Sequence, residues 1–289
     1  MEYALHIVVL AGIFSALSIS LDLLVGHSGL LSLAQAAFFG IGAYASAIIT
    51  TQAGQPPIAA MLVGMAVSAS ISLLVSLPSL RLRDDYFVLA TFAFQMIAFS
   101  IFNNWTGLTK GSLGISGIPS LALPGNRGPA SLGITMASVL MALFVWSLSR
   151  RISRDAFGRV LHGIREDEVF VKSLGKNTMY FKVVIFAFSS ALAALAGSLY
   201  AHYITYVDPT SFTVMDSLLI ISMVIIGGAG STYGPIAGAT CLVVIPEVLR
   251  FVGLPGAIAA NVRQILYGLL LVLTVVMRPA GMVGTRPLQ

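Results

Sequence analysis

Two long stretches of the chain contain no charged side chain, and they limit the possible fold more than any other feature. No Asp, Glu, Lys or Arg occurs between Asp22 and Arg81, or between Asp216 and Glu247. A helix needs about 20 apolar residues to cross the hydrocarbon of a bilayer, so each stretch is long enough for one or two crossings. Backbone groups in lipid must be hydrogen-bonded within the protein, and the crossings are therefore helices. The sequence predicts an all-α, multi-pass membrane protein.

Composition and charge exclude several other classes of protein. Only 9% of the residues are charged, against about 25% in a typical soluble domain. The net charge of +5 does not indicate a nucleic-acid partner here, because the basic residues lie between apolar runs and act as topology signals. The lone cysteine, Cys241, excludes an internal disulfide and argues against a zinc site. The chain is apolar directly after Glu2 and has no basic leader, so no cleaved signal peptide is expected.

Apolar runs predict roughly eight to ten spans, some of them broken or re-entrant, within one transmembrane domain that covers residues 1–289. Charges or clusters of Pro and Gly bound these runs. The run 216–226 is too short to cross alone. The candidate spans are residues 3–25, 31–52, 57–77, 86–103, 130–149, 182–203, 216–226, 234–250 and 258–277.

Basic residues indicate which loops face the cytoplasm. Half of the 16 Lys and Arg residues lie in the segment 150–182, which is therefore predicted to be a cytoplasmic loop. Alternation of the spans then places the loop with Arg81 and Arg83 inside, the loop 103–130 outside, and the N-terminus outside. The basic residues of the segment 150–182 are Arg150, Arg151, Arg154, Arg159, Arg165, Lys172, Lys176 and Lys182.

Two glycine-rich segments, one in each half of the chain, interrupt the predicted helices and have similar sequences. Residues 25–32 read VGHSGLLS and residues 226–233 read IGGAGSTY. Interrupted helices in corresponding places of two halves indicate a transport path, because their freed backbone groups can face a cavity. Ordinary glycine-rich turns between helices are the alternative interpretation. The candidate path residues are Gly26, Ser28, Gly29, Ser32, Gln35, Gly227, Gly228 and Gly230.

Small residues recur at every fourth position on two predicted spans. Such stripes allow two helices to approach closely, so they predict packing and no chemistry. The stripes are Gly64, Ser68, Ser72 and Ser76 on one span and Ser190, Ala194 and Ser198 on another.

Few ionisable or amide side chains fall at membrane depth. An intramembrane charge is a functional candidate, but most of these residues lie near predicted span ends, where helix capping or snorkelling explains them. Asp216 is expected to begin a helix. The residues are Asp22, His27, Gln35, Gln95, His202, Asp216 and Glu247.

No pattern typical of an enzyme occurs in the sequence. Paired acids at helical spacing, a Ser, His and Asp set in a known context and a pair of His ligands are all missing. No phosphate-binding loop ends in Gly-Lys-Ser. We therefore expect no catalytic residue, no metal site and no cofactor bound by this chain.

The basic segment contains apolar residues at nearly helical spacing. Leu161, Ile164, Val171 and Leu174 predict one short surface helix with an apolar side and a charged side. Such a helix either lies in the lipid interface, where its basic residues hold it, or docks a cytoplasmic partner.

Seven stretches, in order along the chain, carry a resemblance to a known family. They are residues 23–44 (LLVGHSGLLSLAQAAFFGIGAY), 77–83 (LPSLRLR), 114–119 (GISGIP), 164–168 (IREDE), 198–203 (SLYAHY), 227–231 (GGAGS) and 278–281 (RPAG). Over nearly its whole length the chain resembles the permease subunits of branched-chain amino acid ABC importers. The resemblance is strongest to the M-type subunit of the high-affinity system.

The resemblance implies an importer in the inner membrane of a bacterium. Two homologous permease chains would form a heterodimer in the lipid, and two ATPase subunits would bind ATP and Mg, while a periplasmic binding protein delivers the solute. A coupling helix of the permease would sit in a cleft of an ATPase. By position in the family, that helix would contain Arg165, Glu166, Asp167, Glu168, Phe170 and Gly175.

This chain departs from the family at residues 169–171, where relatives tend to carry smaller side chains than Val169, Phe170 and Val171. Urea, short amides and small carboxylates are alternative cargoes, since related permeases carry them. A secondary transporter driven by an ion gradient is an alternative in another class, although it would be expected to contain more buried acids.

Overall fold

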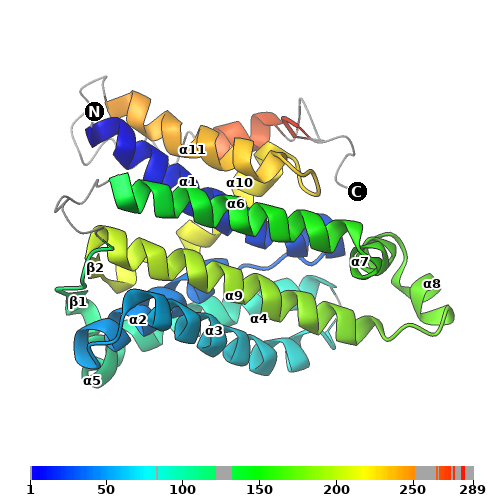
Figure 1. Cartoon of the computed structure of the whole chain (residues 1–289). Coiled ribbons are helices and arrows are strands. Elements are labelled where there is room, and N and C mark those ends of the chain that lie inside the picture. Colours follow the sequence, from blue (N-terminus) through cyan, green and yellow to red (C-terminus); the bar gives the residue numbers. More distant parts are fainter. Residues whose placement is uncertain are drawn as a thin grey trace.

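Long helices run side by side through the molecule (Figure 1). The computed structural model describes residues 2–82, 84–121, 132–250, 265, 267–274, 276 and 281–283. The longest helices are α1 (Glu2–Ser28), α3 (Pro57–Ser79), α4 (Asp84–Asn104), α6 (Leu132–Arg154) and α9 (Thr178–Ile204). Within the described residues, these helices and the segment Pro209–Gly227 make 6 segments that are long and apolar enough to cross a membrane. The prediction of an all-α, multi-pass membrane protein is confirmed.

Three shorter helices complete the body of the bundle. They are α2 (Gln35–Gln52), α10 (Val214–Gly227) and α11 (Gly234–Arg250). Helical residues also occur at 265, 267–274 and 276, whereas the rest of the predicted span 258–277 lies outside the described residues.

The prediction that the seventh span is too short to cross was wrong. Helix α10 has 14 residues, but the 3-10 turn η2 (Pro209–Ser211) precedes it and extends the apolar segment to 19 residues. The expected role of Asp216 is confirmed, because its side chain and that of Thr213 form a capping box at the start of α10.

Short elements occupy the two opposite ends of the bundle (Figure 1). One end carries α5 (Thr106–Thr109), η1 (Gly111–Leu113) and an antiparallel pair of strands, β1 (Ile115–Ser116) and β2 (Tyr206–Val207), in which Ile115 pairs with Val207. The other end carries α7 (Ala156–Glu166) and α8 (Glu168–Ser173). Helix α1 begins at the strand end, which agrees with the predicted placement of the N-terminus opposite the basic segment.

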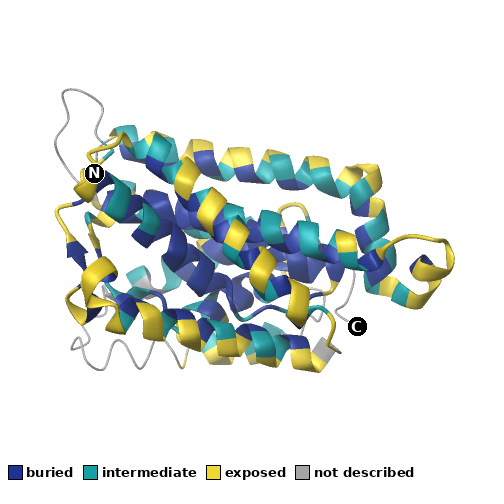
Figure 2. Ribbon diagram, turned by 90° about the horizontal axis from the view of Figure 1, so that it is seen from below, coloured by how far each residue is buried: buried dark blue, intermediate teal, exposed yellow. Residues whose placement is uncertain are grey.

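Helices α1, α2 and α9 form the centre of the bundle, and one face each of α3, α4 and α6 remains exposed (Figure 2). The stripe of small residues on α3 faces α9, where the Ser68 hydroxyl donates to the Ser190 carbonyl at 2.9 Å, and the predicted close packing is confirmed. A Cβ added to Gly42 of α2 would lie 2.1 Å from the Ala194 carbonyl oxygen. Small residues thus bring α2, α3 and α9 into backbone contact.

Candidate functional site

The two glycine-rich interruptions, far apart in the sequence, touch in the structure. The first follows α1 and the second separates α10 from α11. The amide of Gly230 donates to Asp22 Oδ1 at 2.7 Å. A Cβ added to Gly26 would lie 2.2 Å from the amide nitrogen of Gly230. This is too close for any side chain, so only glycine fits at position 26. We call the contact of Gly26 and Asp22 with Gly230 the glycine junction.

Arg165 of α7 joins its helix to both sides of the glycine junction. Its guanidinium donates a hydrogen bond to the Gly26 carbonyl. A Cβ added to Gly29 would lie 3.2 Å from Arg165 Cγ, and one added to Gly230 would lie 3.2 Å from Arg165 Nη1. The resemblance placed Arg165 in the coupling helix, and in the structure its side chain points into the bundle.

A second polar contact ties α7 to the end of α1. The His27 Nδ1 and His162 Nε2 atoms lie 3.1 Å apart, and Ser153 Oγ of α6 lies 2.9 Å from His27 Nε2. Asp22 Oδ2 is 3.8 Å from the same imidazole nitrogen. Among these side chains His162 alone belongs to α7, so a movement of α7 relative to α1 must displace or break the contact between His27 and His162.

The single surface helix predicted for the basic segment is wrong, because the chain forms two helices that are separated at Asp167. Asp167 has an extended backbone (φ −155°, ψ 99°), and its side chain accepts a hydrogen bond from the Phe170 amide at 2.9 Å. An aspartate in this geometry is a favourable N-cap, so it ends α7 and begins α8.

Glu168 fixes α8 to the start of α9. Its carboxylate accepts hydrogen bonds from Lys182 Nζ and Thr178 Oγ1, both at 2.8 Å, and it lies 3.1 Å from Lys172 Nζ. Burial raises the pKa of Glu168, but the bonds from Lys182, Thr178 and Lys172 outweigh it and lower the pKa to about 2. Glu168 therefore holds the position of α8 within this chain.

The outer side of α8 is apolar and exposed at the tip of the molecule (Figure 1). The exposed fractions are 75% for Val169, 59% for Phe170 and 63% for Leu174, whereas Val171 is 6% exposed. Val171 and Leu174 were predicted to lie on one apolar side of a single helix, but the structure buries Val171 and exposes Leu174. Gly175 follows α8 with a φ of +76°, which allows the chain to turn back toward α9.

Helix α2 begins inside the bundle, and side chains from other helices bind its first amides. The amide of Ala37 donates to Gln95 Oε1 at 2.7 Å, and that of Ala36 donates to Ser217 Oγ at 3.0 Å. Gln95 was noted in the sequence as an amide at membrane depth. Ser217 was missed, because a serine on an apolar helix gives no signal of its partner.

Most of the candidate path residues are packed away from any opening. Gln35, for example, is 1% exposed, and its Nε2 donates to Ser20 Oγ at 2.6 Å. Gly29 is exposed and Gly230 is half-buried. The buried residues are Gly26, Ser28, Ser32, Gln35, Gly227 and Gly228. The structure is therefore closed at these positions.

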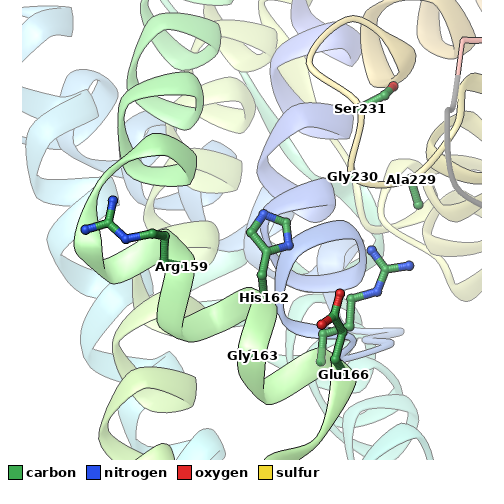
Figure 3. Close-up of a pocket in the computed structure, with 8 residues that line it drawn as sticks. Arg159, His162, Gly163, Glu166, Ala229, Gly230 and Ser231 are labelled. Atoms are coloured by element: carbon green, nitrogen blue, oxygen red, sulfur yellow. The ribbon is translucent and has the colours of Figure 1, made fainter. Parts of the chain in front are cut away.

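A pocket of about 450 Å³ lies between α7 and the second interruption (Figure 3). Gly230 and Arg165 connect it to the glycine junction. No group of three or more His, Cys, Asp or Glu side chains in the described part of the chain could hold a metal ion. The pocket is lined by Arg159, His162, Gly163, Arg165, Glu166, Ala229, Gly230 and Ser231.

Comparison with known proteins identifies the family. Residues 3–275 match the family model described as the permease component of a branched-chain amino acid transport system. The high-affinity branched-chain amino acid permease protein LivM of Salmonella typhimurium is 32% identical over 95% of this chain and 69% of its own length. LivM of Escherichia coli is also 32% identical, over 97% of this chain and 70% of its own length.

A more distant relative extends the match beyond bacteria of that group. The probable LivM protein of Methanocaldococcus jannaschii is 27% identical over 93% of this chain and 85% of its own length. No solved structure matches the chain. The chain belongs to the family of permease components of branched-chain amino acid transport systems.

Proposed function

We propose that this chain is the M-type permease subunit of an ATP-driven importer for branched-chain amino acids in the bacterial inner membrane. The match over residues 3–275 and the similarity to proteins named LivM support this proposal. The remaining subunits are a second, homologous permease, two ATPases that bind ATP and Mg, and a periplasmic binding protein. This chain supplies the conduit and contributes no catalytic group.

In this proposal the exposed apolar side of α8 docks on an ATPase. Val169, Phe170 and Leu174 protrude from the end of the bundle that carries the basic segment. Aromatic side chains that fill a partner's pocket are typical anchors of an interface. The exposed Val169 and Phe170 then require a wider cleft on the ATPase than smaller side chains would at these positions.

The observation that carries the mechanism is the unbroken chain of contacts from α8 to the glycine junction. Glu168 fixes α8 to α9, Asp167 joins α8 to α7, and Arg165 joins α7 to the Gly26 carbonyl. Closure of the two ATPases on ATP moves α8 and, with it, Arg165. In this proposal the bundle then exchanges between two arrangements, and the contact of Gly26 with Gly230 belongs to the closed one.

Uptake by the reconstituted importer tests this proposal. Leucine uptake into proteoliposomes should require ATP and the ATPase subunits, and vanadate should inhibit it. Phe170→Asp should abolish uptake and weaken co-purification with the ATPases, whereas the matched control Phe170→Leu keeps an apolar anchor and should retain most of both. Uptake that an ion gradient drives without any ATPase would reject the proposed class of transporter.

A further inference from the structure

The last turn of α10 ends inside the protein, and its backbone carbonyls need hydrogen-bond donors from elsewhere. The last four carbonyls of a helix have no partner within that helix. The Gly228 amide donates to the Val224 carbonyl at 2.9 Å, but the carbonyls of Ile226 and Gly227 lie beyond it. Both of these residues are buried, and a buried carbonyl without a donor is costly. The end of α10, where the second interruption begins, therefore depends on donors from another segment.

Residues 281–283 supply these donors. The Met282 amide donates to the Ile226 carbonyl at 2.8 Å, and the Val283 amide donates to the Gly227 carbonyl at 3.0 Å. The side chains of Met282 and Val283 are 48% and 43% exposed, so the main chain makes the contact. We call residues 281–283 the carbonyl clamp.

Gly281 allows the carbonyl clamp to approach α10 this closely. Its φ is +76°, a conformation that residues with a side chain rarely adopt. A Cβ at this position would lie 2.4 Å from Gly228 Cα and 2.8 Å from the Ile225 carbonyl oxygen. Both the backbone conformation and the available space therefore require glycine at position 281.

The carbonyl clamp and the glycine junction hold neighbouring points of the second interruption. The clamp binds the Gly227 carbonyl, and the junction holds Gly230, whose amide donates to Asp22. The three residues from Gly227 to Gly230 span at most about 10 Å. A shift of the end of α10 by more than a few ångströms must therefore also move Gly230 away from its partners on α1.

We propose that the carbonyl clamp is a positioning element of the transport path, which holds the end of α10 so that Gly230 stays against Gly26. The inference rests on the proposed function, in which the contact of Gly26 with Gly230 belongs to the closed arrangement. Release of the two clamp bonds frees the end of α10 and favours the open arrangement. The net contribution of one main-chain hydrogen bond is small, so its loss should shift the population between the two arrangements by roughly two- to tenfold.

Cysteine labelling of the assembled importer without ATP tests the clamp. Ser28, at the end of α1, is 3% exposed, and Ser28→Cys reports opening of the junction in a background where Cys241 is replaced by Ser. The α-hydroxy analogue of methionine at position 282 turns the amide into an ester, which removes the donor to the Ile226 carbonyl and keeps the side chain. Labelling by a membrane-impermeant maleimide should then become roughly two- to tenfold faster. Met282→Ala keeps the donor and should label as slowly as the parent.

Gly281→Ala tests the close approach, and Gly117→Ala is its matched control. Gly117 has a φ of +78°, and none of the described residues has an atom within 4 Å of a Cβ at this position. The control therefore carries the same backbone strain without the clash. Gly281→Ala should raise Ser28→Cys labelling at least as much as the ester does, whereas Gly117→Ala should leave it unchanged.

The coupling of hydrolysis to uptake separates positioning from a purely structural role. A variant that only lowers the amount of folded importer reduces leucine uptake and ATP hydrolysis in proportion, whereas a loosened clamp should lower the uptake per ATP hydrolysed. The inference is overturned if the ester variant labels no faster than the parent, or if it lowers uptake and hydrolysis only in proportion. In either case, continued ATP-driven leucine uptake by the wild type shows that the proposed function still holds. Absence of that uptake in the wild type would count against the proposed function itself.

Discussion

Removal of the Arg165 side chain should open the glycine junction while the ATPases remain attached. The guanidinium makes a charge-assisted hydrogen bond to the Gly26 carbonyl, and bonds of this kind contribute about 1.5–3 kcal/mol when buried. Arg165 is only half-buried, so about 1–2 kcal/mol is the better figure. Arg165→Ala should therefore lower the population of the closed arrangement relative to an open one by a factor of about 5–30.

Cysteine labelling measures this change directly. Ser28 at the end of α1 is 3% exposed, so a cysteine introduced there should react slowly with a membrane-impermeant maleimide in a background where Cys241 is replaced by Ser. Arg165→Ala should raise the labelling rate in the absence of ATP by about the same factor of 5–30. Leucine uptake should fall while ATP hydrolysis by the complex continues.

Arg165→Lys provides the matched control. Lysine keeps the charge but has a single donor group in place of the planar guanidinium, so an intermediate labelling rate is expected. If Arg165→Ala leaves both the labelling rate and uptake unchanged, Arg165 does not link α7 to the glycine junction.

Two further changes test the packing of the junction and the anchoring of α8. Gly26→Ala places a Cβ 2.2 Å from Gly230 N and should lower the free energy of unfolding in detergent by about 1–3 kcal/mol. The control Gly107→Ala should change this free energy little, because its Cβ meets only the Trp105 ring at 3.9 Å. Equal thermal denaturation temperatures of the two variants would contradict this expectation. The pKa of Glu168 is lowered from 4.5 to about 2, so its ionised form stabilises α8 above pH 4.5, and this contribution is lost as the pH falls toward 2. The protection of residues 168–178 against hydrogen exchange, relative to the intrinsic exchange rate at each pH, should fall over that range, and Glu168→Gln should already lower it at pH 7. Unchanged protection in the variant would show that Glu168 does not anchor α8.

The sequence predicted the helices well because their signal is local. A stretch without charged residues, such as that between Asp22 and Arg81, lies in lipid, where backbone N–H and C=O groups can be hydrogen-bonded only within the protein. Such a stretch therefore forms helices. The division at Asp167 was also encoded locally, since an aspartate followed by a glutamate is a good helix start. It was overlooked because the apolar spacing of Leu161, Ile164 and Val171 fits one continuous helix.

The contacts of the candidate site could not be predicted in the same way. Gly26 and Gly230 meet only because α1 packs beside α10 and α11, and no local pattern specifies that pairing. Arg165 follows Leu161 by one helical turn and lies on the same side of α7, so burial of Leu161 against the bundle also turns Arg165 toward the glycine junction. The similarity of the two glycine-rich interruptions identified the residues of the candidate site but did not indicate that the two interruptions are in contact.

Photo-crosslinking from α8 tests the central claim most directly. The claim is that an ATPase drives this chain through the exposed side of α8. A photoreactive phenylalanine analogue at Phe170, which is 59% exposed, should crosslink to an ATPase subunit in the assembled importer, and ATP should change the yield. The same analogue at Leu113, which is 81% exposed at the opposite end of the bundle, should give no ATPase adduct. Adducts from Phe170 to lipid alone would contradict the account.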